Sequence, residues 1–346
     1  MHLLVGTGAS HFHELNLNVE NATIEKLSAT ESPAPGWLVS RDETVYAVAE
    51  VDDQPGQLSK FHKDGDNWKL SWRRETSSKG TCHCSLLKAG DKTFVLGANY
   101  TGHTVNVLDD NGVKVDTAAF DGSGPFEGRQ ESSHCHQIVP DLAGKYIYVN
   151  DLGGDTQCRY TLADTGKLQA AGTLKFKPAQ GPRHCAFNPI HPELVYTICE
   201  LSNEITIHDW SSETPRLVQS ISLLPDASME GEQHKEYPQP ASAGEIQITR
   251  DGGLLYASTR YLPKYKSDTI LWARLDSDGK MGKVTHHDTG LIAPWHFSLS
   301  KDEALVGAAF KDSNVVKIYK RDAKDGSLSD LCSVELESPS CVLFVE

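Results

Sequence analysis

The feature that most constrains the fold is a strand–turn–strand pattern that recurs along the whole chain. Each copy begins with a short run around a polar or aromatic anchor and continues, after a turn, into a second apolar run. Two further alternating runs follow in most copies. The anchors are Trp37, His83, His136, His184, Glu245 and His296, roughly 45 to 60 residues apart. Four short strands per repeat at this period predict the blades of a β-propeller.

The two chain ends complete one further repeat. Residues 3–28 read as three strands and lack the inner strand with which the other repeats begin. Residues 339–345 resemble that missing strand. Six complete repeats and one split repeat therefore predict a single all-β domain over residues 1–346: a seven-bladed β-propeller of four-stranded antiparallel blades, with the ring closed between the N- and C-termini.

Charge and hydropathy narrow the classes of partner. The net charge of −14 argues against a nucleic acid or an anionic membrane surface as partner. No apolar run approaches the ~18 residues of a membrane helix, and the N-terminus lacks the basic and apolar regions of a signal peptide. A few convergent arginines can still bind an anion inside a pocket. We therefore expect a small-molecule partner, with neither nucleic acid nor membrane.

The eight cysteines mostly lie within strand-like runs. Buried free thiols are favoured over disulfides, which predicts a cytoplasmic protein. The phosphate-binding glycine loops are absent, and we expect no cofactor. His134 and His136 share a face of a strand but lack the spacing of a zinc motif, so we expect no metal and full activity after chelation.

Titratable side chains recur at two places in the repeats. The first strands begin with His83, His136, His184, Glu245 or His296, and the second strands end with Glu50, Asn99, Asp151, Glu200 or Arg260. Because antiparallel strands place the start of one beside the end of the other, these groups should gather at one mouth of the channel. Side chains at an open mouth add little to a core, so their substitution should leave the melting temperature nearly unchanged. Structural roles remain open: each histidine can bond a neighbouring backbone, and Arg183 and Arg260 can pair with Glu200 or Glu245 for stability alone.

Two long connections, 120–133 and 224–242, either shape the site or form plain surface. The first contains Arg129.

In the anchor and strand-end segments the chain resembles the lactonase family of seven-bladed propellers, which includes propeller-type 6-phosphogluconolactonases and the fungal carboxy-cis,cis-muconate cyclase. The matching segments include Arg129-Gln130, His134-x-His136-Gln137, Asp151-Leu152-Gly153, Gly181-Pro182-Arg183-His184, Glu200-Leu201-Ser202, Glu245-Ile246, Ser258-Thr259-Arg260 and His296-Phe297. The resemblance implies that His136, Arg183, Glu200 and Arg260 carry the activity. The chain departs from the family at Cys199 and near Phe310, where an asparagine is usual.

The resemblance implies hydrolysis of a sugar-acid lactone, phosphorylated or not. Arg183 would stabilise the oxyanion, Glu200 would act as base or orient the water, and His136 would transfer the ring-oxygen proton. Arg260 would hold a distal anion. We expect further substrate contacts from His184, His83, Glu245, His296, Arg129 and Asp151. One alternative is a cycloisomerase that forms a lactone from an unsaturated dicarboxylate. Another is a non-catalytic, protein-binding propeller, which the clustered Arg, His and Glu and the three methionines disfavour.

Overall fold

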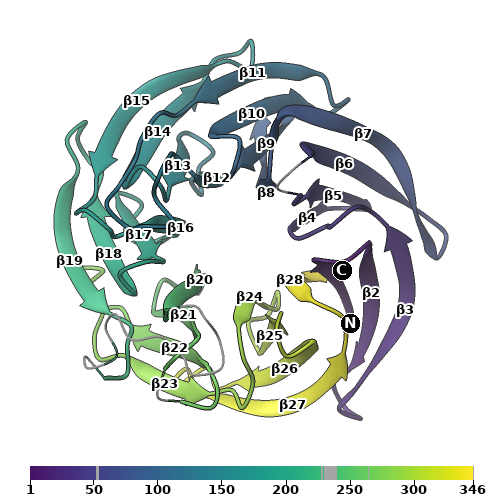
Figure 1. The fold of residues 1–346 in the computed structure, drawn as a ribbon. Coiled ribbons are helices and arrows are strands. Elements are labelled where there is room, and N and C mark those ends of the chain that lie inside the picture. Colours follow the sequence, from purple (N-terminus) through teal and green to yellow (C-terminus); the bar gives the residue numbers. More distant parts are fainter. Residues whose placement is uncertain (52–53, 227–228, 230–239, 264, 346) are drawn as a thin grey trace. The chain divides into compact units, whose positions relative to one another are not determined.

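A computed structural model describes residues 1–51, 54–226, 229, 240–263 and 265–345. Their regular elements are β-strands, which form seven four-stranded sheets (Figure 1). Most of the connection 224–242 lies outside the described residues, so the structure does not test its expected role. Within the described ranges, no helix is long and apolar enough to cross a membrane.

Three sheets follow one another in the first half of the chain. The first contains β4 (Leu38–Arg41), β5 (Thr44–Ala49), β6 (Pro55–Asp64) and β7 (Asn67–Lys79). The second contains β8 (Thr81–Ala89), β9 (Lys92–Asn99), β10 (Thr104–Asp109) and β11 (Lys114–Ala119). The third contains β12 (Cys135–Pro140), β13 (Ile147–Asp151), β14 (Thr156–Leu162) and β15 (Leu168–Lys175).

Three more sheets follow in the second half. They contain β16 (Pro182–Phe187), β17 (Leu194–Cys199), β18 (Glu204–Asp209) and β19 (Arg216–Ser222); then β20 (Ser242–Ile248), β21 (Leu254–Arg260), β22 (Thr269–Arg274) and β23 (Thr285–Asp288); and then β24 (Pro294–Leu299), β25 (Leu305–Phe310), β26 (Val315–Arg321) and β27 (Leu328–Glu335). In all six sheets the strands lie side by side in chain order.

The seventh sheet combines the two ends of the chain. Its strand order is β28 (Pro339–Val345), β1 (His2–Thr7), β2 (His11–Asn18) and β3 (Thr23–Glu31). The prediction that residues 339–345 supply the missing inner strand is confirmed. The fold is the predicted seven-bladed β-propeller.

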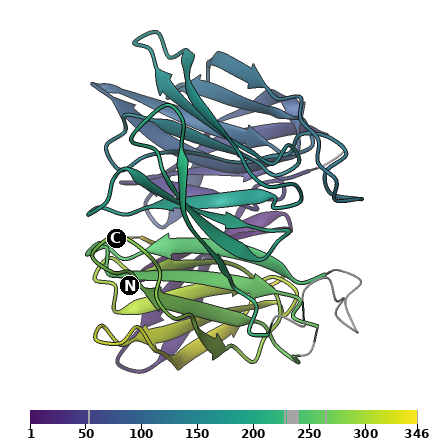
Figure 2. The ribbon, with the colours of Figure 1, turned by 90° about the vertical axis from the view of Figure 1, so that its left-hand side faces the viewer.

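The described residues cluster into two compact parts. The C-terminal part comprises Met1, Leu17–Glu25 and Arg183–Phe344, and the N-terminal part comprises His2–Asn16, Lys26–Pro182 and Val345. Within the C-terminal part, Figure 2 shows the sheets β20–β23 and β24–β27, in green to yellow, as successive layers.

The second strand of each sheet is buried on both faces. Strand β21 is buried along its whole length. Because successive side chains of a strand point to opposite faces, Leu254 and Tyr256 pack into one cluster with sheet β24–β27, while Leu255 and Ala257 pack into another with sheet β16–β19. The nearly continuous apolar runs in the sequence follow from this packing of sheets face to face.

β-bulges interrupt the beginnings of the first strands. The register shifts between Thr81 and His83 in β8, between Cys135 and Gln137 in β12, between Ala243 and Ile246 in β20, and between Pro294 and His296 in β24. A bulge places two residues opposite one and redirects their side chains. His136, Glu245 and Trp295 therefore leave the regular alternation of the sheet.

All eight cysteines are free thiols, and six of them are buried.

Candidate active site

The centre of the site in the C-terminal part is one carboxylate oxygen that two arginines share. Glu200 is the first residue after β17. Arg183 Nε donates to Glu200 Oε2 at 3.0 Å, and Arg260 Nη2 lies 2.9 Å from the same oxygen. Arg183 and Arg260 are each 2% exposed and Glu200 is 4% exposed. This burial gives the two arginines more contact with the protein interior than the sequence-based prediction for side chains at an open mouth assumed.

The bulge in β20 explains how both guanidiniums are held. It presents two successive carbonyl groups: Ala243 O accepts from Arg260 Nη2 at 2.8 Å, and Gly244 O accepts from Arg183 Nη1 at 3.0 Å. Position 244 has no room for a side chain, because a Cβ there would lie 2.5 Å from Ser258 Oγ. A glycine at the bulge therefore allows the close approach of the strands that supports the two arginines.

These three groups carry an unbalanced charge. Two guanidiniums stay protonated at any physiological pH, and one carboxylate lies between them. Within these three groups one positive charge is left over in a buried position, where an unpaired charge is costly. Glu245, whose pKa is raised by burial, is a further carboxylate in the field of both arginines. Arg260 Nε has no hydrogen-bond partner among the described residues. An anion that contacts this cluster would balance the charge.

A second buried network adjoins the arginines. His184 Nδ1 lies 3.0 Å from Glu245 Oε2, and His296 Nε2 lies 3.9 Å from the same oxygen. His296 Nδ1 accepts a hydrogen bond from Val342 N at 3.2 Å, so its Nε2 carries the proton when the ring is neutral. Burial raises the pKa of Glu245.

The two imidazoles of this network are neutral at pH 7. Burial, together with the nearby Arg183 guanidinium, lowers the pKa of His184 well below its usual range. Burial also lowers the pKa of His296. Arg183 Nη1 lies 3.3 and 3.4 Å from the two ring nitrogens of His184, so the imidazole supports the guanidinium without adding a second positive charge.

An aromatic platform lies beside Arg260. The centroid of the Trp295 ring is 4.3 Å from Arg260 Cζ and 4.1 Å from Lys311 Nζ. Tyr261, the first residue after β21, donates from its Oη to Asp312 Oδ2 at 3.0 Å. Sequence reasoning missed Trp295 and Lys311. Lys311 nevertheless has a recognisable position, because it follows the second strand of its sheet as Glu200 follows β17.

In the N-terminal part, Tyr100 brings three predicted or neighbouring residues together. Its ring stacks on His134 at 4.2 Å and meets His136 edge-on at 5.6 Å, while Arg129 Nη2 donates to its hydroxyl at 3.3 Å. Burial lowers the pKa of His134. His136 itself is half-buried at the bulge of β12. The Asn99-Tyr100 segment belongs to the resemblance, but its sequence alone did not mark Tyr100 as a site residue.

Asp151 and His83 have structural contacts in the same part. Asp151 accepts hydrogen bonds from His134 N at 2.6 Å, Ser133 Oγ at 2.8 Å and Gly154 N at 3.0 Å, which fixes the chain before β12. His83 is buried, with its ring 4.5 Å from that of Trp37. Among the described residues, no group of three or more His, Cys, Asp or Glu is arranged to hold a metal ion.

The fold and the buried arginines define a β-propeller with a cluster of two arginines and one carboxylate where inner strands begin and second strands end. The chain belongs to the lactonase family of seven-bladed β-propellers, whose family model matches residues 2–344. A 6-phosphogluconolactonase of Bacillus subtilis is 26% identical over 349 residues, which cover 98% of this chain and 95% of that protein. A 6-phosphogluconolactonase of Formosa agariphila is 26% identical over 341 residues, which cover 94% and 92%.

A solved structure supports the same fold. The periplasmic gluconolactonase PpgL of Pseudomonas aeruginosa has a TM-score of 0.86 and 23% identity to this chain, with 100% of this chain and 99% of that one covered. At this identity the likeness concerns the fold alone.

Proposed function

We propose that this protein hydrolyses the lactone of a sugar acid. The observation that carries the proposal is the buried pair Arg183 and Arg260 with its single shared carboxylate, which leaves one positive charge for an anion. Lactone hydrolysis builds negative charge on the carbonyl oxygen, and it releases a carboxylate. A preorganised cation in a buried site stabilises both charges more than it would in water. The names of the relatives in Bacillus subtilis and Formosa agariphila support this reaction.

In the proposed reaction, water gives one proton to a base as its oxygen adds to the lactone carbonyl carbon, and the carbonyl oxygen becomes an oxyanion. Arg183 faces this charge with its planar donor group. The ring C–O bond then breaks, and the ring oxygen leaves as a hydroxyl after it receives a proton. The sequence-based assignment of the proton transfer to His136, whose imidazole suits this role near neutral pH, stays a prediction.

Glu200 has a different role from that of a general base. Its Oε2 already accepts from both guanidiniums, and a carboxylate that neutralises cations is a poor proton acceptor. We assign to Glu200 the positioning of Arg183 and Arg260. Glu245, His184 and His296 hold Arg183 from the other side.

The test is a hydrolysis screen with gluconolactone and its 6-phosphate, with cyclisation of carboxymuconate measured in parallel. The wild-type protein should hydrolyse at least one lactone. Arg183→Met should lower kcat by about a hundredfold or more, the usual effect of removing an oxyanion donor. Arg216→Met is the matched control, because Arg216 is an exposed arginine of the same part.

Circular dichroism must show that both variants are folded. A folded Arg183→Met variant with normal turnover would overturn the assignment of Arg183. Failure of the wild-type protein on every lactone, or exclusive cyclisation of carboxymuconate, would overturn the proposed function itself.

A further inference from the structure

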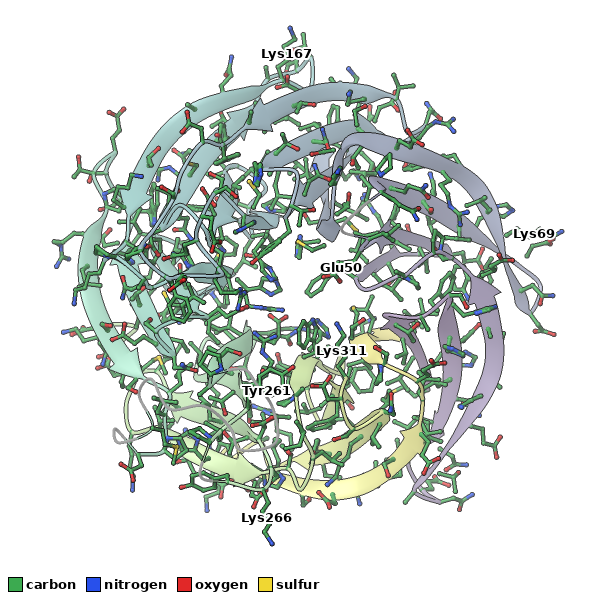
Figure 3. The ribbon with its side chains drawn as sticks, viewed as in Figure 1. Glu50, Lys69, Lys167, Tyr261, Lys266 and Lys311 are labelled. Carbon is green, nitrogen blue, oxygen red and sulfur yellow. The ribbon has the colours of Figure 1, made fainter. Side chains whose placement is uncertain are left out.

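Lys311 is the accessible cation of the C-terminal cluster. It is half-buried, as is Trp295, whereas Arg183 and Arg260 are almost completely buried. It follows directly on β25, and its ammonium lies 4.1 Å from the centroid of the Trp295 ring. In Figure 3, Lys266, another lysine of this part, points away from the strands.

The ammonium of Lys311 has no carboxylate within ion-pair distance in the part of the chain that the structure describes. The nearest acidic residue in sequence, Asp312, accepts the hydroxyl hydrogen of Tyr261. The contact of Lys311 with Trp295 is a cation–π interaction, which orients the ammonium without neutralising it. Lys317 in the same sheet differs: it lies over Tyr319 but pairs with Asp330 at 2.9 Å.

Trp295 links Lys311 to the buried arginines. The centroid of the same indole ring lies 4.3 Å from Arg260 Cζ, so both cations contact one aromatic side chain. Arg260 in turn shares the Glu200 oxygen with Arg183. Arg183, Arg260 and Lys311 are therefore linked through Glu200 and Trp295, and Lys311 is the most exposed of the three cations.

This arrangement suits a substrate with two acidic centres. Arg183 faces the charge that develops at the lactone carbonyl. A second, permanent negative charge on the same molecule would lie toward Lys311, where a phosphate accepts hydrogen bonds from an ammonium without a preferred direction. Lys311 is more exposed than Arg260, to which the sequence assigned the distal anion.

We propose that Lys311, positioned by Trp295, binds the phosphate of a phosphorylated sugar lactone and sets the preference for it over the uncharged lactone. The proposal rests on the proposed lactonase function.

The test compares Lys311→Met with the wild type on gluconolactone 6-phosphate and on gluconolactone. Loss of a hydrogen bond to a charged group should lower kcat/KM for the phosphorylated lactone about 10- to 100-fold, mainly through KM. The value for gluconolactone should change less than about twofold. Lys311→Arg, which keeps the charge, should retain most of the preference. Lys317→Met is the matched control for loss of a lysine–aromatic contact and should leave the preference unchanged.

A binding measurement separates this proposal from the proposed function. Inorganic phosphate should raise the melting temperature of the wild type and of Lys317→Met, but much less that of Lys311→Met. If the wild type hydrolyses no lactone, the proposed function fails, and the phosphate titration still decides whether Lys311 binds the anion. Equal losses on both lactones, or an unchanged phosphate shift in Lys311→Met, would overturn the role of Lys311.

Discussion

Replacement of Glu200 by glutamine tests the electrostatic reasoning most directly. The side chain keeps its shape and one carbonyl oxygen, but loses the charge that two buried guanidiniums share. The cluster of Arg183, Arg260 and residue 200 then carries two uncompensated positive charges in place of one. Both arginines are 2% exposed, so water can screen them little.

The magnitude follows from the two ion pairs. At an effective dielectric constant of about 20, each pair with charges about 4 Å apart is worth about 4 kcal/mol. Part of this is offset because the amide avoids the cost of burying a carboxylate. Removal of one partner from a buried pair costs about 3–5 kcal/mol. We expect the free energy of unfolding of Glu200→Gln to fall by that amount.

Urea unfolding followed by tryptophan fluorescence measures this loss. Glu213→Gln is the matched control, because it makes the same charge change at an exposed position of the same part, and its unfolding free energy should change by less than about 0.5 kcal/mol. The double variant Glu200→Gln with Arg260→Gln restores the original net charge and should be more stable than the sum of the two single changes predicts. Additive effects, or a Glu200→Gln variant as stable as the control, would refute the reasoning.

Three further predictions follow from the buried groups. Burial lowers the pKa of His208 to about 4, so stability that is present above pH 6.5 is lost as the pH falls toward 4 and the ring must be protonated. His208→Gln should therefore reduce the acid-induced loss of unfolding free energy, measured with urea, by about 3 kcal/mol. An unchanged pH profile of stability would contradict this. Gly244→Ala should displace Ser258 and lower both turnover and melting temperature, whereas Gly290→Ala, where a Cβ meets open space but φ is +70°, should lower stability only. Chelation with EDTA should leave turnover unchanged, and restoration of a lost activity by a divalent ion would make His134 and His136 candidate ligands.

The fold could be predicted because its determinants are local and repeated. Each second strand, such as Leu254–Arg260, is an apolar run with turns on both sides, and seven copies leave few alternative architectures. The sheet that combines the two chain ends was also predictable. The N-terminal repeat lacks an inner strand, and the C-terminus carries one additional strand of that kind. The close contact of Arg183 with Glu200 follows from the neighbouring strands β16 and β17 and agrees with the sequence-based grouping, whereas the contact of His184 with Glu245 joins two sheets.

The exposure of the site residues could not be predicted, because it depends on bulges and on packing between strands far apart in the sequence. A sequence pattern with a period of two residues assumes that side chains alternate regularly between the two faces of a strand, and this alternation fails at Glu245 and Trp295. The bulge in β20 brings two carbonyl groups to Arg183 and Arg260, and nothing in Ala243-Gly244-Glu245 alone indicates that they will meet arginines. Lys311 escaped notice for a related reason: a lysine after a strand is usually a solvated surface residue.

The surplus of positive charge explains why such a site needs so rigid a scaffold. Two guanidiniums around one carboxylate repel each other, and in a flexible protein they would separate and become hydrated. Here Ala243 O, Gly244 O and Glu200 Oε2 fix them, and strands buried on both faces leave no room for that separation. The packing of the sheets offsets the repulsion between Arg183 and Arg260. An incoming anion is therefore attracted by both cations without first having to bring them together.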